Sequence, residues 1–105
     1  MWNHTLSWAT IRTSMARLGS AEDRGYFEKR AFARVLMTLR EERGMTQETL
    51  AFDSGYHPKY ISLLERGKYN PSLTAILEIS NALNISGADL VRRVESLLPG
   101  SRRRR

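Results

Sequence analysis

The side chains best suited to recognising another molecule are concentrated on one short stretch, from His57 to Gly67. Read as a helix, this stretch turns five side chains outward: His57, Lys59, Ser62, Leu63 and Arg66. Lys59 can donate hydrogen bonds to O6 and N7 of guanine, and Leu63 can contact the methyl group of thymine. These residue types suit binding to another molecule, and the edges of base pairs are one surface that they fit.

Two short helices joined by a glycine turn would position this surface, in the stretch that begins at Thr46. Thr46 is a good N-cap for the first helix, and Met45 and Leu50 have the spacing of a hydrophobic staple around it. Ala51 is small enough to let a second helix cross closely. Gly55 falls where the first helix must end and the chain must reverse, a position that favours positive φ.

The second helix is predicted to begin at Pro58, because a missing N–H costs nothing at the first helical position. Tyr56 and Ile61 repeat the staple spacing around this start, and Ile61 and Leu64 supply a buried edge. A helix of about nine residues is too short to be stable alone in water, so its neighbours must support it. Such a pair of helices is typical of proteins that lay the second helix in a DNA major groove.

The residues at these offsets resemble the Cro/C1-type (Xre-like) helix-turn-helix family of phage and bacterial repressors. The matching residues are Thr46-Gln47, Leu50-Ala51, Gly55, Ile61-Ser62, Glu65-Arg66-Gly67 and Asn70-Pro71-Ser72-Leu73. The resemblance extends from about Phe32 to about Leu90. It implies an all-α fold, a compact five-helix lambda-repressor-like DNA-binding domain that contains a helix-turn-helix.

We expect three parts along the chain. Residues 1–25 form an N-terminal extension that could be a helical arm. Residues 26–98 form the domain, with the helix-turn-helix at about 47–66. Residues 99–105 form a disordered basic tail.

The resemblance also implies which residues would contact DNA. The base-reading positions would be Pro58, Lys59, Ser62 and Leu63, with Tyr60 reaching a base or a phosphate. The phosphate-contacting positions would be Thr46, Gln47, Arg66, Lys68 and Asn70. Gln47 also has a physical reason to bind phosphate, because it lies at a helix N-terminus. Pro58 departs from the polar residue common at its position and offers no side-chain hydrogen bond.

The same resemblance implies a salt bridge between Arg40 and Glu65, which would tie the first domain helix to the recognition helix. Ala51, Gly55 and Ile61 would complete this structural support.

Apolar residues at helical spacing predict the helices around the motif. A helix from about 26 to 43 would bury Phe32, Val35, Leu36 and Leu39, and end at Gly44. A helix capped by Ser72 would complete the core with Leu73, Ile76, Leu77, Ile79 and Leu83. Ser86 would cap a last helix.

This last helix carries more apolar surface than one packed face needs. The surplus residues are Val91, Val94, Leu97 and Leu98. They predict the seam of a homodimer, although packing of the N-terminal segment would also use them. Phe52, on the outer side of the first motif helix, would be covered by the N-terminal arm or form part of a partner surface.

The first 21 residues contain no acidic residue, and Trp8, Ile11, Met15 and Leu18 recur at helical spacing. Three interpretations remain open. The segment is an accessory helix or loose arm that packs on the domain or on a second subunit, an upstream extension with Met15 as the natural start, or an organelle transit peptide. It lacks the continuous apolar core of a secretory signal.

Composition limits the function classes. The chain of 105 residues suits one domain, and its net charge of +6 owes much to the four arginines at 102–105. The rest of the chain has thirteen basic and eleven acidic residues, so the folded part is only mildly basic. The absence of cysteine excludes thiolate metal sites and fits a cytosolic setting. No apolar run is long enough to span a membrane.

We find no acid pair, phosphate loop or metal-binding motif, so we expect neither an enzyme nor a cofactor or metal site. The sequence predicts a cytoplasmic, nucleoid-associated regulator of bacterial or phage origin, most simply a repressor that binds a near-palindromic operator on double-stranded DNA as a homodimer. An antitoxin with a toxin partner, a restriction–modification controller and a protein-interaction adaptor remain alternatives.

Overall fold

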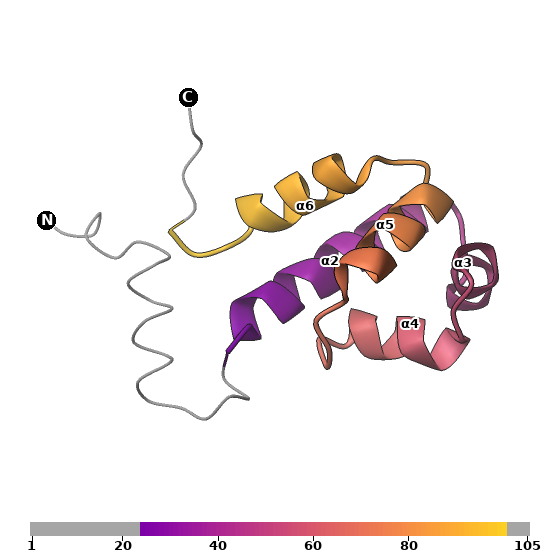
Figure 1. Ribbon diagram of the computed structural model, residues 1–105, viewed down its shortest axis with the longest axis horizontal. Coiled ribbons are helices and arrows are strands. Elements are labelled where there is room, and N and C mark those ends of the chain that lie inside the picture. Colours follow the sequence, from indigo (N-terminus) through magenta and orange to yellow (C-terminus); the bar gives the residue numbers. More distant parts are fainter. Residues whose placement is uncertain (1–23, 101–105) are drawn as a thin grey trace, which may run out of the picture.

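The computed structural model describes residues 24–100, and within that range it contains helices and no strand (Figure 1). The helices are α2 (Tyr26–Glu42), α3 (Gln47–Ser54), α4 (Pro58–Glu65), α5 (Leu73–Ala82) and α6 (Gly87–Ser96). The described range therefore confirms the expected all-α, five-helix fold. The predicted arm and the arginine run at 102–105 lie outside the described residues.

Hydroxyl caps begin three of these helices as expected. The side-chain oxygens of Thr46, Ser72 and Ser86 each accept the backbone N–H three residues ahead, at 3.0 Å. Each bond satisfies one of the donors that an opening helical turn leaves free. At the other end of α5, Asn84 has a φ of 59°, the left-handed conformation that lets the chain leave a helix.

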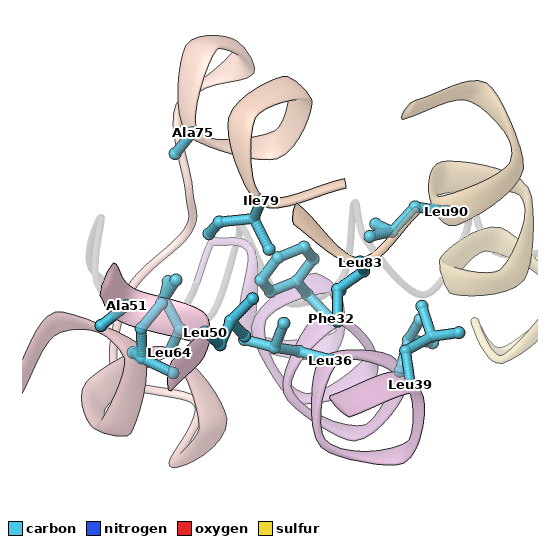
Figure 2. Packing of buried hydrophobic residues seen from close by; sticks show 12 residues of the cluster. Phe32, Leu36, Leu39, Leu50, Ala51, Leu64, Ala75, Ile79, Leu83 and Leu90 are labelled. Carbon is cyan, nitrogen blue, oxygen red and sulfur yellow. The ribbon is translucent and has the colours of Figure 1, made fainter. Parts of the chain in front are cut away.

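The core lies between α2 and the other four helices. Its members are buried apolar side chains from every helix, namely Phe32, Val35, Leu36, Leu39, Leu50, Ala51, Ile61, Leu64, Ala75, Ile79, Leu83 and Leu90. Figure 2 shows the Phe32 ring directed at Ile79 and Leu83, with Leu36 beside Leu50. Helix α2 packs directly on α4 and α6, and α3 and α5 close the core between them.

Two residues predicted for the core are not in it. Leu73 is 70% exposed and Leu77 is 52% exposed, whereas Ala75, Ile79 and Leu83 are buried. Helix α5 is apolar on two sides: Ala75 and Ile79 face the core, whereas Leu73 and Leu77 lie on the more exposed side. Periodicity shows that such a helix has apolar stripes, but it does not show which one turns inward.

The packing puts α4 at the edge of the domain. Helix α4 contacts α2 and α3, whereas α6 contacts α2 and α5. In Figure 1, α4 and α6 lie on opposite sides of α2. The outer face of α4 therefore remains open to solvent.

Candidate nucleic-acid interface

The turn between α3 and α4 depends on Gly55. Its backbone has φ 84° and ψ 20°, and the N–H groups of Gly55 and Tyr56 both bond to the carbonyl of Ala51 at 2.9 Å. A Cβ built on Gly55 would meet no atom within 4 Å. Glycine is needed here for its conformation and not for space.

Helix α4 begins with a cap that the sequence analysis missed. His57 is the N-cap residue, and its Nδ1 accepts the backbone N–H of Lys59 at 3.0 Å. Pro58 occupies the first helical position, as expected. That position of Pro58 was the available signal, because the residue before the first helical residue is the N-cap.

Two tyrosines brace the start of α4. The rings of Tyr56 and Tyr60 stack with centroids 4.9 Å apart, and the Tyr56 hydroxyl donates to Glu78 Oε1 of α5 at 2.6 Å. This hydrogen bond, with some burial, raises the pKa of Tyr56 to about 12. Burial raises the pKa of Tyr60. The ring of Tyr60 thus supports the helix, and contact of its hydroxyl with DNA stays a prediction.

The expected pair of Arg40 and Glu65 is present and fixes the other end of α4. Arg40 donates from Nε to Glu65 Oε2 at 2.6 Å and from Nη2 to Glu65 Oε1 at 3.0 Å. The Glu65 side chain is only 1% exposed. The hydrogen bond with Glu65 raises the pKa of Arg40 against the opposing effect of burial. A third donor of Arg40, Nη1, bonds to the carbonyl of Met45 at 2.8 Å.

Gln47, the candidate phosphate ligand, belongs to this same network. Its Nε2 donates to Glu65 Oε1 at 2.9 Å, which fixes the direction of the side-chain amide. An amide nitrogen has two hydrogens, so one donor of Gln47 remains for another acceptor. The first backbone N–H groups of α3 have no acceptor within the helix and carry the positive end of its dipole. These donors lie together at the start of α3, where binding of a phosphate stays a prediction.

The candidate base-reading residues share the outer face of α4 but differ in exposure. Lys59 is exposed, whereas Pro58, Ser62 and Leu63 are half-buried. The candidate phosphate ligands beyond the helix, Arg66, Lys68 and Asn70, are all exposed. Thr46 is exposed, but its hydroxyl is occupied by the cap.

The charge of this surface is of one sign. From Pro58 to Asn70 the chain has three basic residues and a single acidic one, Glu65. Because Glu65 is buried and bonded to Arg40 and Gln47, its charge does not face outward. The face of α4 and the turn after it are therefore electropositive, as contact with phosphates requires.

Among residues 24–100, no three His, Cys, Asp or Glu side chains come together in a way that could hold a metal ion. In the same residues we find no helix with the length and apolarity to cross a membrane.

The fold and this surface define a helix-turn-helix domain with an exposed recognition helix. The helix-turn-helix family model matches residues 36–90, and the chain belongs to the Cro/C1-type (Xre-like) family of helix-turn-helix regulators.

Three relatives illustrate the match. The chain is 39% identical over 64 residues to the HTH-type transcriptional regulator y4dJ of Sinorhizobium fredii. This match covers 61% of the present chain and 83% of the relative. It is 49% identical over 47 residues to the control protein C.BamHI of Bacillus amyloliquefaciens, and this match covers 45% of the present chain and 58% of C.BamHI. The crystal structure of the restriction–modification controller C.AhdI of Aeromonas hydrophila matches with 42% identity and a TM-score of 0.60, covering 62% of this chain and 98% of that one.

Proposed function

We propose that this protein is a transcriptional repressor that binds a near-palindromic operator on duplex DNA as a homodimer, with α4 in the major groove. One observation carries the proposal. The outer face of α4 is open and free of carboxylates, while its inner face is fixed through the buried Glu65. A rigid, electropositive helix at the edge of a domain has the shape and charge to enter the groove.

Base reading would rest mainly on Lys59, the exposed donor nearest the start of α4. It is long enough to reach O6 and N7 of guanine, and Ser62 and Leu63, one turn later, would contact the neighbouring base pairs. Pro58 would approach the DNA without a hydrogen bond. The His57 cap bonds the backbone N–H of Lys59 and so holds the first turn of the helix from which the Lys59 side chain extends.

Phosphate contacts would position the helix from both ends. Gln47, held by Glu65, would donate its remaining amide hydrogen and its backbone N–H to one phosphate. Arg66, Lys68 and Asn70 would contact the backbone on the other side of the groove. Such contacts fix the register of the helix and do not discriminate between sequences.

A homodimer would double the small number of base contacts that one α4 can make. Val91 of α6 and Leu97, the C-cap of this helix, are 39% and 48% exposed, and Val94 and Leu98 are half-buried. Leu77 of α5 extends this apolar surface, because it lies against the start of α6. We expect sedimentation to show a dimer at micromolar concentration, and the pair Val91→Glu and Leu97→Glu to produce a folded monomer. A wild-type monomer at high micromolar concentration, with and without operator DNA, would remove the dimer from the proposal.

The competing function is that of an adaptor that uses the same fold to bind proteins. Electrophoretic shifts on a duplex selected from random DNA separate the two. In a repressor, Lys59→Ala costs about 1–3 kcal/mol of binding and relaxes the sequence preference, whereas Gln47→Ala weakens binding to all sequences alike. Arg92→Ala, which removes an exposed charge on α6, is the control. In an adaptor, neither variant loses specific affinity.

A role as a restriction–modification controller is a second candidate, favoured by the similarity to C.AhdI and C.BamHI. In that case the operator would lie upstream of genes for a methyltransferase and an endonuclease. Mapping the bound sites on the native DNA tests this role. A toxin gene or a divergent phage promoter beside the bound site would favour the other regulatory roles instead.

A further inference from the structure

Three arginines line one groove, and two of them, Arg30 and Arg34, have no part in the contacts proposed above. Arg30 and Arg34 lie one turn apart on α2, and Arg66 follows α4; all three are exposed. The groove has a volume of about 650 Å³ and runs along α2 between Tyr26 and Thr38, from the end of α4 to the region after α6. Tyr26, Met37 and Leu97 supply its apolar lining. We call Arg30, Arg34 and Arg66 the arginine track.

The arginine track adjoins the turn that follows the recognition helix. A Cβ built on Gly67 would lie 3.8 Å from Cγ and 3.9 Å from Cα of Arg30. One built on Gly25, the N-cap of α2, would collide with the side-chain amide of Asn70. The first turns of α2 thus pack against both ends of the turn, and Arg30 continues the row of basic side chains that begins with Lys68 and Arg66.

The charges of the arginine track are not neutralised within residues 24–100. The ion pairs in that range join Arg40 to Glu65, Arg43 to Glu42 and Arg92 to Asp89, and none includes the track. Glu65 is the sole carboxylate that residues 24–100 contribute to the lining of the groove, and it is already bonded to Arg40 and Gln47. The Arg30 guanidinium lies 5.8 Å from the centre of the Tyr26 ring, a cation–π contact that holds it without satisfying its hydrogen-bond donors.

We propose that the arginine track binds the phosphate backbone of the DNA that flanks each half-site, so that the interface extends from the helix-turn-helix onto α2. This inference rests on the proposed function. Duplex DNA is the anion that the placement favours, because Arg66 belongs to both the groove and the end of the recognition helix. Arg30, which packs on Gly67, lies nearest the turn and contributes most; Arg34 extends the contact along α2.

The test uses two duplexes carrying the same selected operator. One ends at the outer edges of the half-sites, and the other continues for about one helical turn on each side. The full chain is compared with the double variant Arg30→Ala and Arg34→Ala. Arg92→Ala removes another exposed arginine, from α6, and is the control.

On the long duplex, we expect the double variant to reduce the slope of log K against log salt by about 0.9 for each lost contact, or about tenfold in affinity per contact at 0.1 M salt. On the short duplex the loss disappears, and the preference for operator over random DNA is unchanged on both. Arg30→Lys with Arg34→Lys keeps most of the slope, because phosphate also accepts from lysine.

An equal loss on both duplexes, or no difference from Arg92→Ala, overturns the inference. If the groove instead binds an acidic protein partner, the double variant will bind DNA in the same way as the Arg92→Ala control. The proposed function fails separately, if the wild-type chain shows no preference for the selected operator.

Discussion

The guanidinium of Arg40 and the carboxylate of Glu65 meet through two hydrogen bonds, of 2.6 and 3.0 Å, across 25 positions of sequence. Arg40 lies near the end of α2, and Glu65 is the last residue of α4. Gln47, the first residue of α3, donates to the same carboxylate. One buried acid therefore fixes the mutual arrangement of three helices, and with it the direction of the recognition helix.

Removing the cation of this pair should lower the free energy of unfolding. Arg40→Met leaves the carboxylate of Glu65 buried without a cation, and we expect a loss of about 3 kcal/mol in the free energy of unfolding. Glu65→Gln added to Arg40→Met should restore part of the stability, because the buried group is then neutral. Urea denaturation measures both. A double variant no more stable than Arg40→Met would show that the uncompensated charge is not the cause.

The two leucines that the sequence did not distinguish should respond differently to truncation. Leu83 is fully buried, so Leu83→Ala should destabilise the fold by about 2–5 kcal/mol. Leu73 is 70% exposed, so Leu73→Ala should change stability by no more than about 0.5 kcal/mol. Thermal or urea unfolding at low protein concentration compares them. Equal losses would contradict the position of Leu73 on the exposed side of α5.

Gly55 should tolerate a side chain poorly although there is room for one. Gly55→Ala forces a Cβ into left-handed backbone geometry, and we expect a loss of about 1–2 kcal/mol. Gly55→Asn should lose less, because asparagine adopts this conformation more readily. The unfolding midpoints of the two variants separate the effect of backbone conformation from that of a steric clash. An alanine variant more stable than the asparagine variant would contradict the conformational role of Gly55.

The brace between Tyr56 and Glu78 should make stability depend on alkaline pH. The pKa of Tyr56 is raised from 10.0 to about 12 in the folded chain. The contribution of the Tyr56–Glu78 hydrogen bond to the free energy of unfolding is therefore complete below pH 10 and disappears as the pH rises toward 12. Tyr56→Phe cannot ionise and should lose that part of the dependence. Urea midpoints across this window test the assignment. Parallel profiles for the two proteins would refute it.

Features set by local sequence could be predicted. The Thr46 cap, the Gly55 turn and the Pro58 start each depend on the conformational preferences of one residue type. The pairing of Arg40 with Glu65 came from the family resemblance, because no local rule joins residues so far apart.

Features that depend on packing could not be predicted from periodicity. The exposure of Leu73 depends on which side of α5 the other helices cover. The contact of Tyr56 with Glu78 needs α4 and α5 to be placed first. The arginine track has no sequence signal of its own, since Arg30 and Arg34 have the spacing of any solvated helix face until α2 is packed on the turn at Gly67.

The measurement closest to the central claim is selection of bound sites from random duplex DNA, carried out with the wild-type chain and with Lys59→Ala. Recognition by two copies of α4 predicts one short motif, present twice in inverted orientation with centres about 10 base pairs or a multiple of that apart. Lys59→Ala should relax the preference at one position of each copy. The absence of an enriched motif, or a motif that Lys59→Ala leaves unchanged at every position, would contradict the assignment of α4 as the reading helix.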